Sequence, residues 1–224
     1  MKITAVVGSP HGRHGTTGRL LEEVLAGLDR EAQVELIELS LLHISPCHGC
    51  NLCHKVGRCF VRDDFEPVRQ ALLASDGFIL ASPNYVFSVS AQLKALFDRC
   101  CGIIHCLALE GKYGAVVETS GSGEDDEVIR YIERFVNATG AQSVGGIGGS
   151  AAGVRALSGD DLLLRKAQEL GRELCRCIRE KEHFPDQAGF RGTFKARMKR
   201  LVEQKKDDWS FEYQYWQERH TAIS

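Results

Sequence analysis

Near its start the chain reads Ile3-Thr4-Ala5-Val6-Val7-Gly8-Ser9-Pro10, a short apolar run that ends in a Gly-Ser-Pro turn. The run has the length and the β-branched content of a buried strand. A glycine-rich stretch follows, after which apolar residues recur at helical spacing over residues 20–28. This part of the sequence therefore predicts a strand, a loop and a helix, in that order.

The same pattern recurs along the chain. Further strands are expected at residues 34–39, 77–81, 113–119 and 141–147, and further helices at residues 65–73, 89–100, 128–136 and 160–180. Strands that alternate with helices form a parallel sheet covered on both faces, because the crossovers are right-handed. We therefore predict an α/β fold, a flavodoxin-like doubly wound sheet of five parallel strands in the order 2-1-3-4-5.

The pattern occupies residues 1–183, and residues 184–224 differ from it. This C-terminal extension is polar and charged, and we expect a helix followed by an arm. Its last part carries the aromatic residues Trp209, Phe211, Tyr213, Tyr215 and Trp216. Such side chains have to be buried, either on their own domain or on a partner subunit, where the arm would act as a lid over a shared active site.

Composition limits the partners and the compartment. The formal net charge of -2 and the pI near 6.5 give no overall attraction to nucleic acid or to an anionic membrane. No apolar stretch is long enough to cross a bilayer, and no signal peptide is visible at the start. With an odd count of nine cysteines, we expect reduced thiols and a cytoplasmic protein. Five of them are expected to be small hydrophobic residues of helices: Cys100, Cys101, Cys106, Cys175 and Cys177.

The other four cysteines crowd into one loop, residues 43–62, with the spacing C-x2-C-x2-C-x5-C. They are Cys47, Cys50, Cys53 and Cys59. Four thiolates so close in sequence can enclose one metal centre, and three at successive x2 intervals favour a [4Fe-4S] cluster. Zinc and a metal-free, reduced loop are the alternatives. His48 and His54 lie in the same loop, and we expect both to be solvated rather than to be ligands.

Three loops follow strands one, three and four, whose carboxyl ends meet at one edge of such a sheet, where ligands bind. The first is rich in glycine and hydroxyl groups and suits a phosphate, with Ser9, His11, Gly15, Thr16 and Thr17 as candidate ligands. The second could pack beside a planar ring through Pro83, Asn84, Tyr85, Val86 and Phe87. The third would let a flat cofactor approach closely at Thr119, Ser120, Gly121 and Gly123.

Over about the first 180 residues these motifs resemble the NAD(P)H-dependent FMN reductase superfamily, specifically its iron–sulfur flavoprotein branch. The matching motifs are Gly8-Ser9-Pro10-His11, Gly15-Thr16-Thr17, Asp63-Asp64, Pro83-Asn84-Tyr85, Leu93-Lys94 and Asp98-Arg99. Two residues depart from the family pattern. His11 stands where arginine is usual, and Thr16 stands where asparagine is usual.

The resemblance implies an oxidoreductase that binds FMN at the three loops and works as a homodimer or a tetramer. It also implies a small-molecule or protein electron donor and acceptor, with NADH or NADPH as a donor. The four cysteines would hold a [4Fe-4S] cluster that passes electrons to or from FMN, and no side chain is assigned as an essential acid or base. Two alternatives stay open: a cluster-free NAD(P)H-dependent FMN or quinone reductase, and a zinc-stabilised flavodoxin-like module that is not an enzyme.

Overall fold

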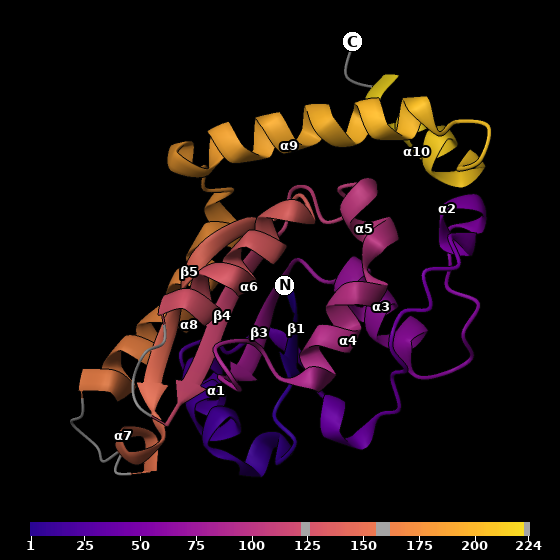
Figure 1. The fold of residues 1–224 in the computed structure, drawn as a ribbon. Coiled ribbons are helices and arrows are strands. Elements are labelled where there is room, and N and C mark those ends of the chain that lie inside the picture. The colour runs from indigo at the N-terminus through magenta and orange to yellow at the C-terminus, as the bar shows by residue number, and fades with distance from the viewer. Residues whose placement is uncertain (122–125, 156–161, 222–224) are drawn as a thin grey trace.

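A computed structural model describes residues 1–121, 126–155 and 162–221 and shows one parallel sheet between two layers of helices (Figure 1). The strands are β1 (Lys2–Val7), β2 (Gln33–Glu38), β3 (Gly77–Pro83), β4 (Tyr113–Ser120) and β5 (Gln142–Ser150). Their order is β2-β1-β3-β4-β5, and every neighbouring pair is parallel. The predicted flavodoxin-like α/β fold and its strand order are confirmed.

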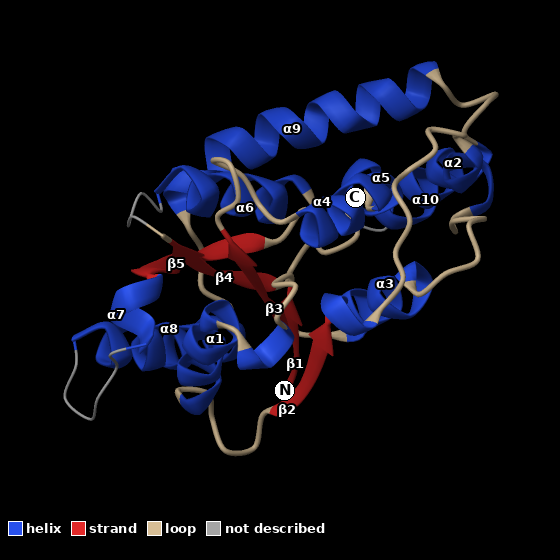
Figure 2. Cartoon of the chain, turned by 60° about the horizontal axis from the view of Figure 1, so that its bottom comes forward, coloured by secondary structure: helices blue, strands red, loops and turns tan. Residues whose placement is uncertain are grey.

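Helices cover both faces of this sheet (Figure 2). On one face lie α1 (Thr16–Ala26), α7 (Ala151–Arg155) and α8 (Leu162–Glu180), packed on alternate side chains of the strands. On the other face lie α3 (Phe65–Ala74), α4 (Ala91–Arg99), α5 (Cys101–His105) and α6 (Asp126–Ala138). Strands β3 and β4 are buried along their whole length, which explains why they read as nearly continuous apolar runs.

Two of the covering helices approach each other unusually closely. A Cβ atom at Gly171 of α8 would lie 2.1 Å from the carbonyl oxygen of Val24 in α1, so the two backbones touch here. The cysteines outside the loop behave largely as expected, because Cys100, Cys106, Cys175 and Cys177 are buried and Cys101 is half-buried. Within the described ranges, no helix combines the length and the apolar character that crossing a bilayer requires.

The C-terminal extension forms two helices, α9 (Pro185–Gln204) and α10 (Ser210–Thr221), so the expected arm is itself helical. Helix α9 runs along α6 and α5, and α10 turns back to the short helix α2 (Leu52–Val56) of the cysteine loop (Figure 1). A small apolar core joins the extension to the domain and contains Leu107, Met198, Val202 and Trp216. Within this chain the aromatic arm packs on its own domain, with Trp216 buried, Trp209, Tyr213 and Tyr215 half-buried, and Phe211 exposed.

Candidate functional site

The loop after β1 is tightly folded against the end of β2. It contains the single turn η1 (Gly12–His14) and faces η2 (Leu39–Leu41). Gly12 has a φ of 56°, which favours glycine, and a Cβ atom there would displace the Glu38 carboxylate, whose oxygen lies 2.1 Å from that position. The same carboxylate accepts a hydrogen bond of 2.8 Å from the backbone N–H of Arg13. The buried hydroxyl of Ser9 accepts one from the N–H of His11. These contacts hold the loop in place without a ligand.

Helix α1 begins directly after this loop, at Thr16, so its unpaired N-terminal amides and positive dipole end lie at the carboxyl edge of the sheet. Thr17 is buried, and its hydroxyl lies 2.6 Å from the hydroxyl of Thr119 at the end of β4. That hydrogen bond joins the first loop to the third. His11 is exposed.

The loop after β3 contains a strained, exposed turn. Tyr85 and Ser88 exchange both backbone hydrogen bonds, which makes Val86 and Phe87 the central residues of a two-residue hairpin. Their φ angles are 52° and 62°, a left-handed conformation that β-branched and bulky residues rarely adopt. Val86 is 90% exposed and Phe87 is 73% exposed. Strain and exposed apolar surface at one turn are typical of a ligand-binding segment.

The loop after β4 lies beside the second loop. The N–H of Asn84 donates a hydrogen bond of 2.8 Å to the carbonyl oxygen of Thr119, and Pro83 and Thr119 are register partners in the sheet. Thr119 and Ser120 are buried, whereas a Cβ atom at Gly121 would meet no other atom within 4 Å. Gly121 therefore leaves open space at this edge. Of the candidates, Gly123 lies outside the described residues.

The cysteine loop is closed at its base by two aspartates. Asp64 and His43 exchange hydrogen bonds, the backbone N–H of Asp64 to the carbonyl of His43 and the N–H of His43 to the Asp64 carboxylate. The carboxylate of Asp63 accepts the N–H of Ser45 at 2.9 Å. Asp63 also pairs with both terminal nitrogens of Arg99 at 2.8 and 3.0 Å. Arg99 in turn donates to the carbonyl of Ser45. Residues 45 and 63 are therefore held together at the neck of the loop.

The Asp63–Arg99 pair is almost fully buried, with each side chain 1% exposed. Burial alone would raise the pKa of Asp63, but hydrogen bonds from Arg99 and from two backbone amides outweigh it and hold the pKa well below its usual range. Burial would likewise lower the pKa of Arg99, and the Asp63 carboxylate and the Cys59 thiol raise it instead. The guanidinium is thus a permanent buried cation next to one of the four cysteines.

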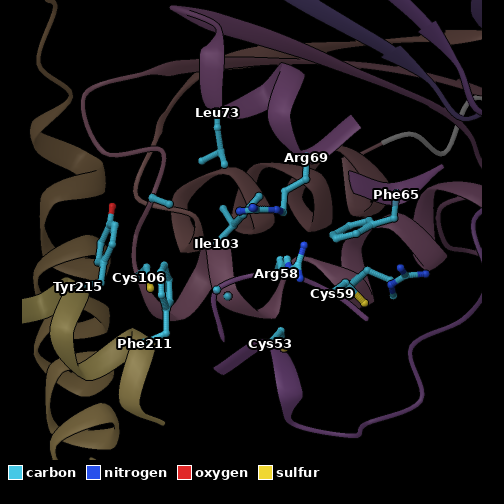
Figure 3. A pocket seen from close by; sticks show the side chains of 14 residues that line it. Cys53, Arg58, Cys59, Phe65, Arg69, Leu73, Ile103, Cys106, Phe211 and Tyr215 are labelled. Atoms are coloured by element: carbon cyan, nitrogen blue, oxygen red, sulfur yellow. The ribbon is translucent and has the colours of Figure 1, made fainter. Parts of the chain in front are cut away.

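Two of the four cysteines face a cavity of about 190 Å³ beneath α10 (Figure 3). Cys53 and Cys59 are half-buried in its wall, whereas Cys47 and Cys50 are exposed. The cavity is also lined by three arginines and by apolar and aromatic side chains, among them Arg58, Arg69, Arg99, Phe65, Ile103, Phe211 and Tyr215. The two half-buried thiols therefore share a largely apolar hollow, in which Arg69 is paired with Glu66 and Arg99 with Asp63.

The four thiols are not arranged for a single tetrahedral ion. Zinc bound by four thiolates brings its sulfur atoms to about 3.8 Å from one another, from Zn–S bonds of about 2.3 Å. In the described part of the chain, no three thiols gather within 4.8 Å. A cluster holds its thiolates farther apart, because four irons and their sulfides lie between them.

The sequence did not predict a buried group of polar and aromatic side chains beside the cysteine loop. His54 is buried rather than solvated, so the expectation for His54 is wrong, whereas His48 is exposed as expected. The Nδ1 atom of His54 lies 2.6 Å from one oxygen of the Glu212 carboxylate, and the Nδ1 atom of His105 lies 3.1 Å from the other. The indole of Trp209 stacks on both imidazoles. No sequence pattern connects residues so far apart in the chain.

Charge explains how this group tolerates burial. Desolvation would lower the pKa of His54, but its contacts with Cys53 and Glu212 raise it to about 10. Burial would raise the pKa of Glu212, and hydrogen bonds from His105 and His54 lower it. His54, His105 and Glu212 also have ligand types and spacing that suit a metal ion, with ligand atoms within 4.8 Å. Because each carboxylate oxygen already faces one imidazole, hydrogen bonding accounts for the arrangement.

Comparison with known proteins identifies the fold's relatives. Residues 1–150 match the family model described as NADPH-dependent FMN reductase. The chain belongs to this family. It is 34% identical to an iron–sulfur flavoprotein of Archaeoglobus fulgidus over 185 residues, which cover 81% of this chain and 82% of that protein. It is 31% identical to an iron–sulfur flavoprotein of Methanocaldococcus jannaschii, with 80% and 98% covered.

These relatives place the chain in the iron–sulfur flavoprotein branch of the FMN reductase family, as the sequence motifs indicated. Solved structures confirm the fold: a flavone reductase superimposes with a TM-score of 0.63 at 18% identity, covering 82% of this chain and 65% of the other. An apo NADH:FMN oxidoreductase superimposes with a TM-score of 0.58 at 22% identity, with 83% and 92% covered. The chain is therefore an FMN-dependent oxidoreductase by family, and α9 and α10 lie outside the matched family model.

Proposed function

We propose that this chain binds FMN at the three loops and a [4Fe-4S] cluster at Cys47, Cys50, Cys53 and Cys59, and passes electrons singly between the two. The observation that carries the cluster is the buried Asp63–Arg99 pair, which closes the loop around its four thiols. A metal-free loop of solvated cysteines would gain little from so costly a buried pair.

The residues present fit a cluster. The Nε atom of Arg99 is buried and has no hydrogen-bond partner among the described residues, and it belongs to a side chain that contacts Cys59 and lines the cavity. A cluster with four thiolate ligands is anionic, and its sulfur atoms accept hydrogen bonds. Arg58 would offset part of that charge, whereas Arg69 and Arg99 are already paired with Glu66 and Asp63. The cavity offers space beside Cys53 and Cys59. Cys47 and Cys50, on the open side of the loop, would complete the ligand set.

The residues present also fit FMN. The N-terminus of α1 and the hydroxyls of Ser9, Thr16 and Thr17 would hold the phosphate, because backbone amides and the helix dipole favour a dianion. Gly121 has no side chain to block a flat ring, and the exposed side chains of Val86 and Phe87 would cover such a ring. FMN supplies two-electron chemistry when bound, and the cluster carries one electron at a time.

Residues of the chain would position FMN and shield it from water. The Thr17–Thr119 hydrogen bond holds the first loop against the third. The Val86–Phe87 turn would exclude water from the edge of a bound flavin ring. NADH or NADPH is the expected donor, and a homodimer or tetramer is the expected assembly, since the exposed apolar turn offers a surface to a second copy.

The test is anaerobic purification followed by an absorbance spectrum and metal analysis. We expect brown protein with a broad absorbance beyond the flavin bands, and iron and sulfide bound in the ratio that one cluster per chain requires. Yellow, iron-free protein would contradict the cluster and leave an NAD(P)H-dependent FMN or quinone reductase. Colourless protein that contains zinc would contradict both cofactors.

A further inference from the structure

The first turn of α10, with the residue that precedes it, contacts the stretch of the cysteine loop between Cys53 and Cys59. The indole of Trp209 stacks on His54 with 4.3 Å between ring centroids. The hydroxyl of Ser210 donates a hydrogen bond of 3.2 Å to the carbonyl oxygen of Lys55. Residues from the end of the chain thus cover a segment that lies more than 150 positions earlier.

The next two residues of α10 complete the contact. The ring of Phe211 lies on the backbone of Gly57, where a Cβ atom would come within 2.4 Å of the ring. Gly57 has a φ of 74°, so glycine is needed there both for the turn and for the ring. The carboxylate of Glu212 is fully buried and joins His54 to His105 of α5. A buried carboxylate is costly to desolvate, and both its oxygens are satisfied here by imidazoles.

Helix α2 needs such support. It has five residues, and a helix of that length is not stable alone in water. It carries Cys53, and the N–H of Gly57 bonds to the carbonyl of Cys53. The base of the loop is held by Asp63 and Arg99, but those contacts do not reach α2. Helix α2 also contacts α5, but its more extensive contacts are with α10, whereas Cys59 packs on the core of the sheet domain. The N-terminal turn of α10 is therefore the main support of Cys53.

We propose that α10 is a positioning element for the cysteine loop, with Glu212 as its key positioning residue, acting through His54 and His105. It holds Cys53 in the cavity wall beside Cys59, ready for a cluster, while Phe211 and Tyr215 shield both thiols from solvent. The statement that the cysteines are held ready for a cluster rests on the proposed function. The statement that α10 holds the cysteine loop in place does not. Because α10 lies outside the matched family model, this device belongs to the extension of this chain.

The first experiment uses the metal-free full-length chain and needs no cluster. Each cysteine's rate of alkylation by iodoacetamide is followed by mass spectrometry in the wild type, in Glu212→Gln and in Glu218→Gln. Glu218 lies on the same helix but is exposed, so its substitution is the matched control. We expect Glu212→Gln to raise the rate at Cys53 by about tenfold, because the buried network loses its negative charge and one of its two acceptor oxygens, and α2 opens more often.

Two internal references separate local from global effects. Cys47 is already exposed and should react equally in all three proteins, and Cys175 is buried under α1 and should stay protected. If Glu212→Gln also exposes Cys175, the variant is globally unstable, and Phe211→Ala replaces it as the milder test. Phe211 is partly exposed, and its removal should raise the rates at Cys53 and Cys59 alone. Unchanged rates at Cys53 in the folded variants would overturn the proposal.

The second experiment measures iron. After anaerobic reconstitution, release of iron to a chelator should be about tenfold faster from Glu212→Gln than from the wild type or Glu218→Gln. Equal release in all three would overturn the positioning role. If the wild type takes up no iron while the alkylation difference is present, the proposed cluster fails and the hold of α10 on the cysteines stands.

Discussion

Replacing Asp63 by asparagine tests the neck of the cysteine loop. The side chain keeps its shape and one acceptor oxygen, so a bond to the N–H of Ser45 or Phe65 survives. The negative charge is lost, and Arg99, whose side chain is 1% exposed, is left as an unpaired buried cation. Breaking a buried ion pair in this way costs about 3–5 kcal/mol of the free energy of unfolding. We expect a loss near the lower end, about 3 kcal/mol, because one acceptor oxygen survives.

Urea unfolding at neutral pH measures this loss, with Glu66→Gln as the control. The Glu66 carboxylate also binds an arginine, Arg69, through two nitrogens, but this pair lies nearer the surface. We expect its loss to cost less than about 1 kcal/mol. A double variant, Asp63→Asn with Arg99→Met, should recover about 2 kcal/mol relative to the sum of the single changes, because no unpaired charge remains.

The contribution of Asp63 to the free energy of unfolding should also depend on pH. Since the pKa of Asp63 is lower in the folded chain than its unfolded value of about 3.9, the pair stabilises the fold above that pH. This stabilisation is lost as the pH falls towards the folded pKa. The gap between wild type and Asp63→Asn should therefore narrow below about pH 4. Three results would contradict this role of Asp63: a difference in the free energy of unfolding below about 1 kcal/mol at neutral pH, a difference equal to that of Glu66→Gln, or a difference that does not change in acid.

Two further predictions concern the FMN edge. Changing Val86-Phe87 to Asn-Gly puts the preferred residues into the left-handed turn and should raise the free energy of unfolding by about 1–2 kcal/mol. The same change should weaken FMN binding, measured by fluorescence titration. A lower free energy of unfolding would show that the turn is not strained. Thr17→Val removes the hydroxyl that faces Thr119 and should raise the FMN dissociation constant about tenfold. Thr139→Val is the control, because this buried threonine bonds to the carbonyl of Val136, away from the three loops. It should destabilise the chain similarly but leave FMN affinity unchanged. Equal FMN affinity in the two variants would show that the phosphate does not bind at Thr17.

The sheet could be predicted from sequence because its determinants are local. A buried parallel strand has to be apolar along its whole length, and a covering helix has to repeat its apolar residues every three or four positions, so both leave a periodic trace. The loops at the carboxyl edge followed from topology once the strands were placed. The four cysteines were visible from spacing alone, although spacing did not show that two face a cavity and two face solvent.

The contacts that hold the cysteine loop could not be predicted in the same way. Asp63 and Arg99 are 36 positions apart, and only the family resemblance singled them out, without saying that they pair. His54 and Glu212 are 158 positions apart, and no periodicity connects a loop histidine to a glutamate among aromatic residues. A buried charge pair depends on where two elements meet in space, which propensity and pattern do not record. The expectation of a solvated His54 failed for this reason.

The two ion pairs divide the support of the cysteine loop between two parts of the chain. Asp63–Arg99 ties the base of the loop to α4 and so depends only on the sheet domain that matches the family model. His54–Glu212 ties the helix that carries Cys53 to α10, which the family model does not include. A redox centre transfers electrons well when its surroundings change little between oxidation states, and a loop held at only one end would leave Cys53 free to move. The C-terminal extension therefore supplies, within one chain, rigidity that the loop's own short helix cannot provide.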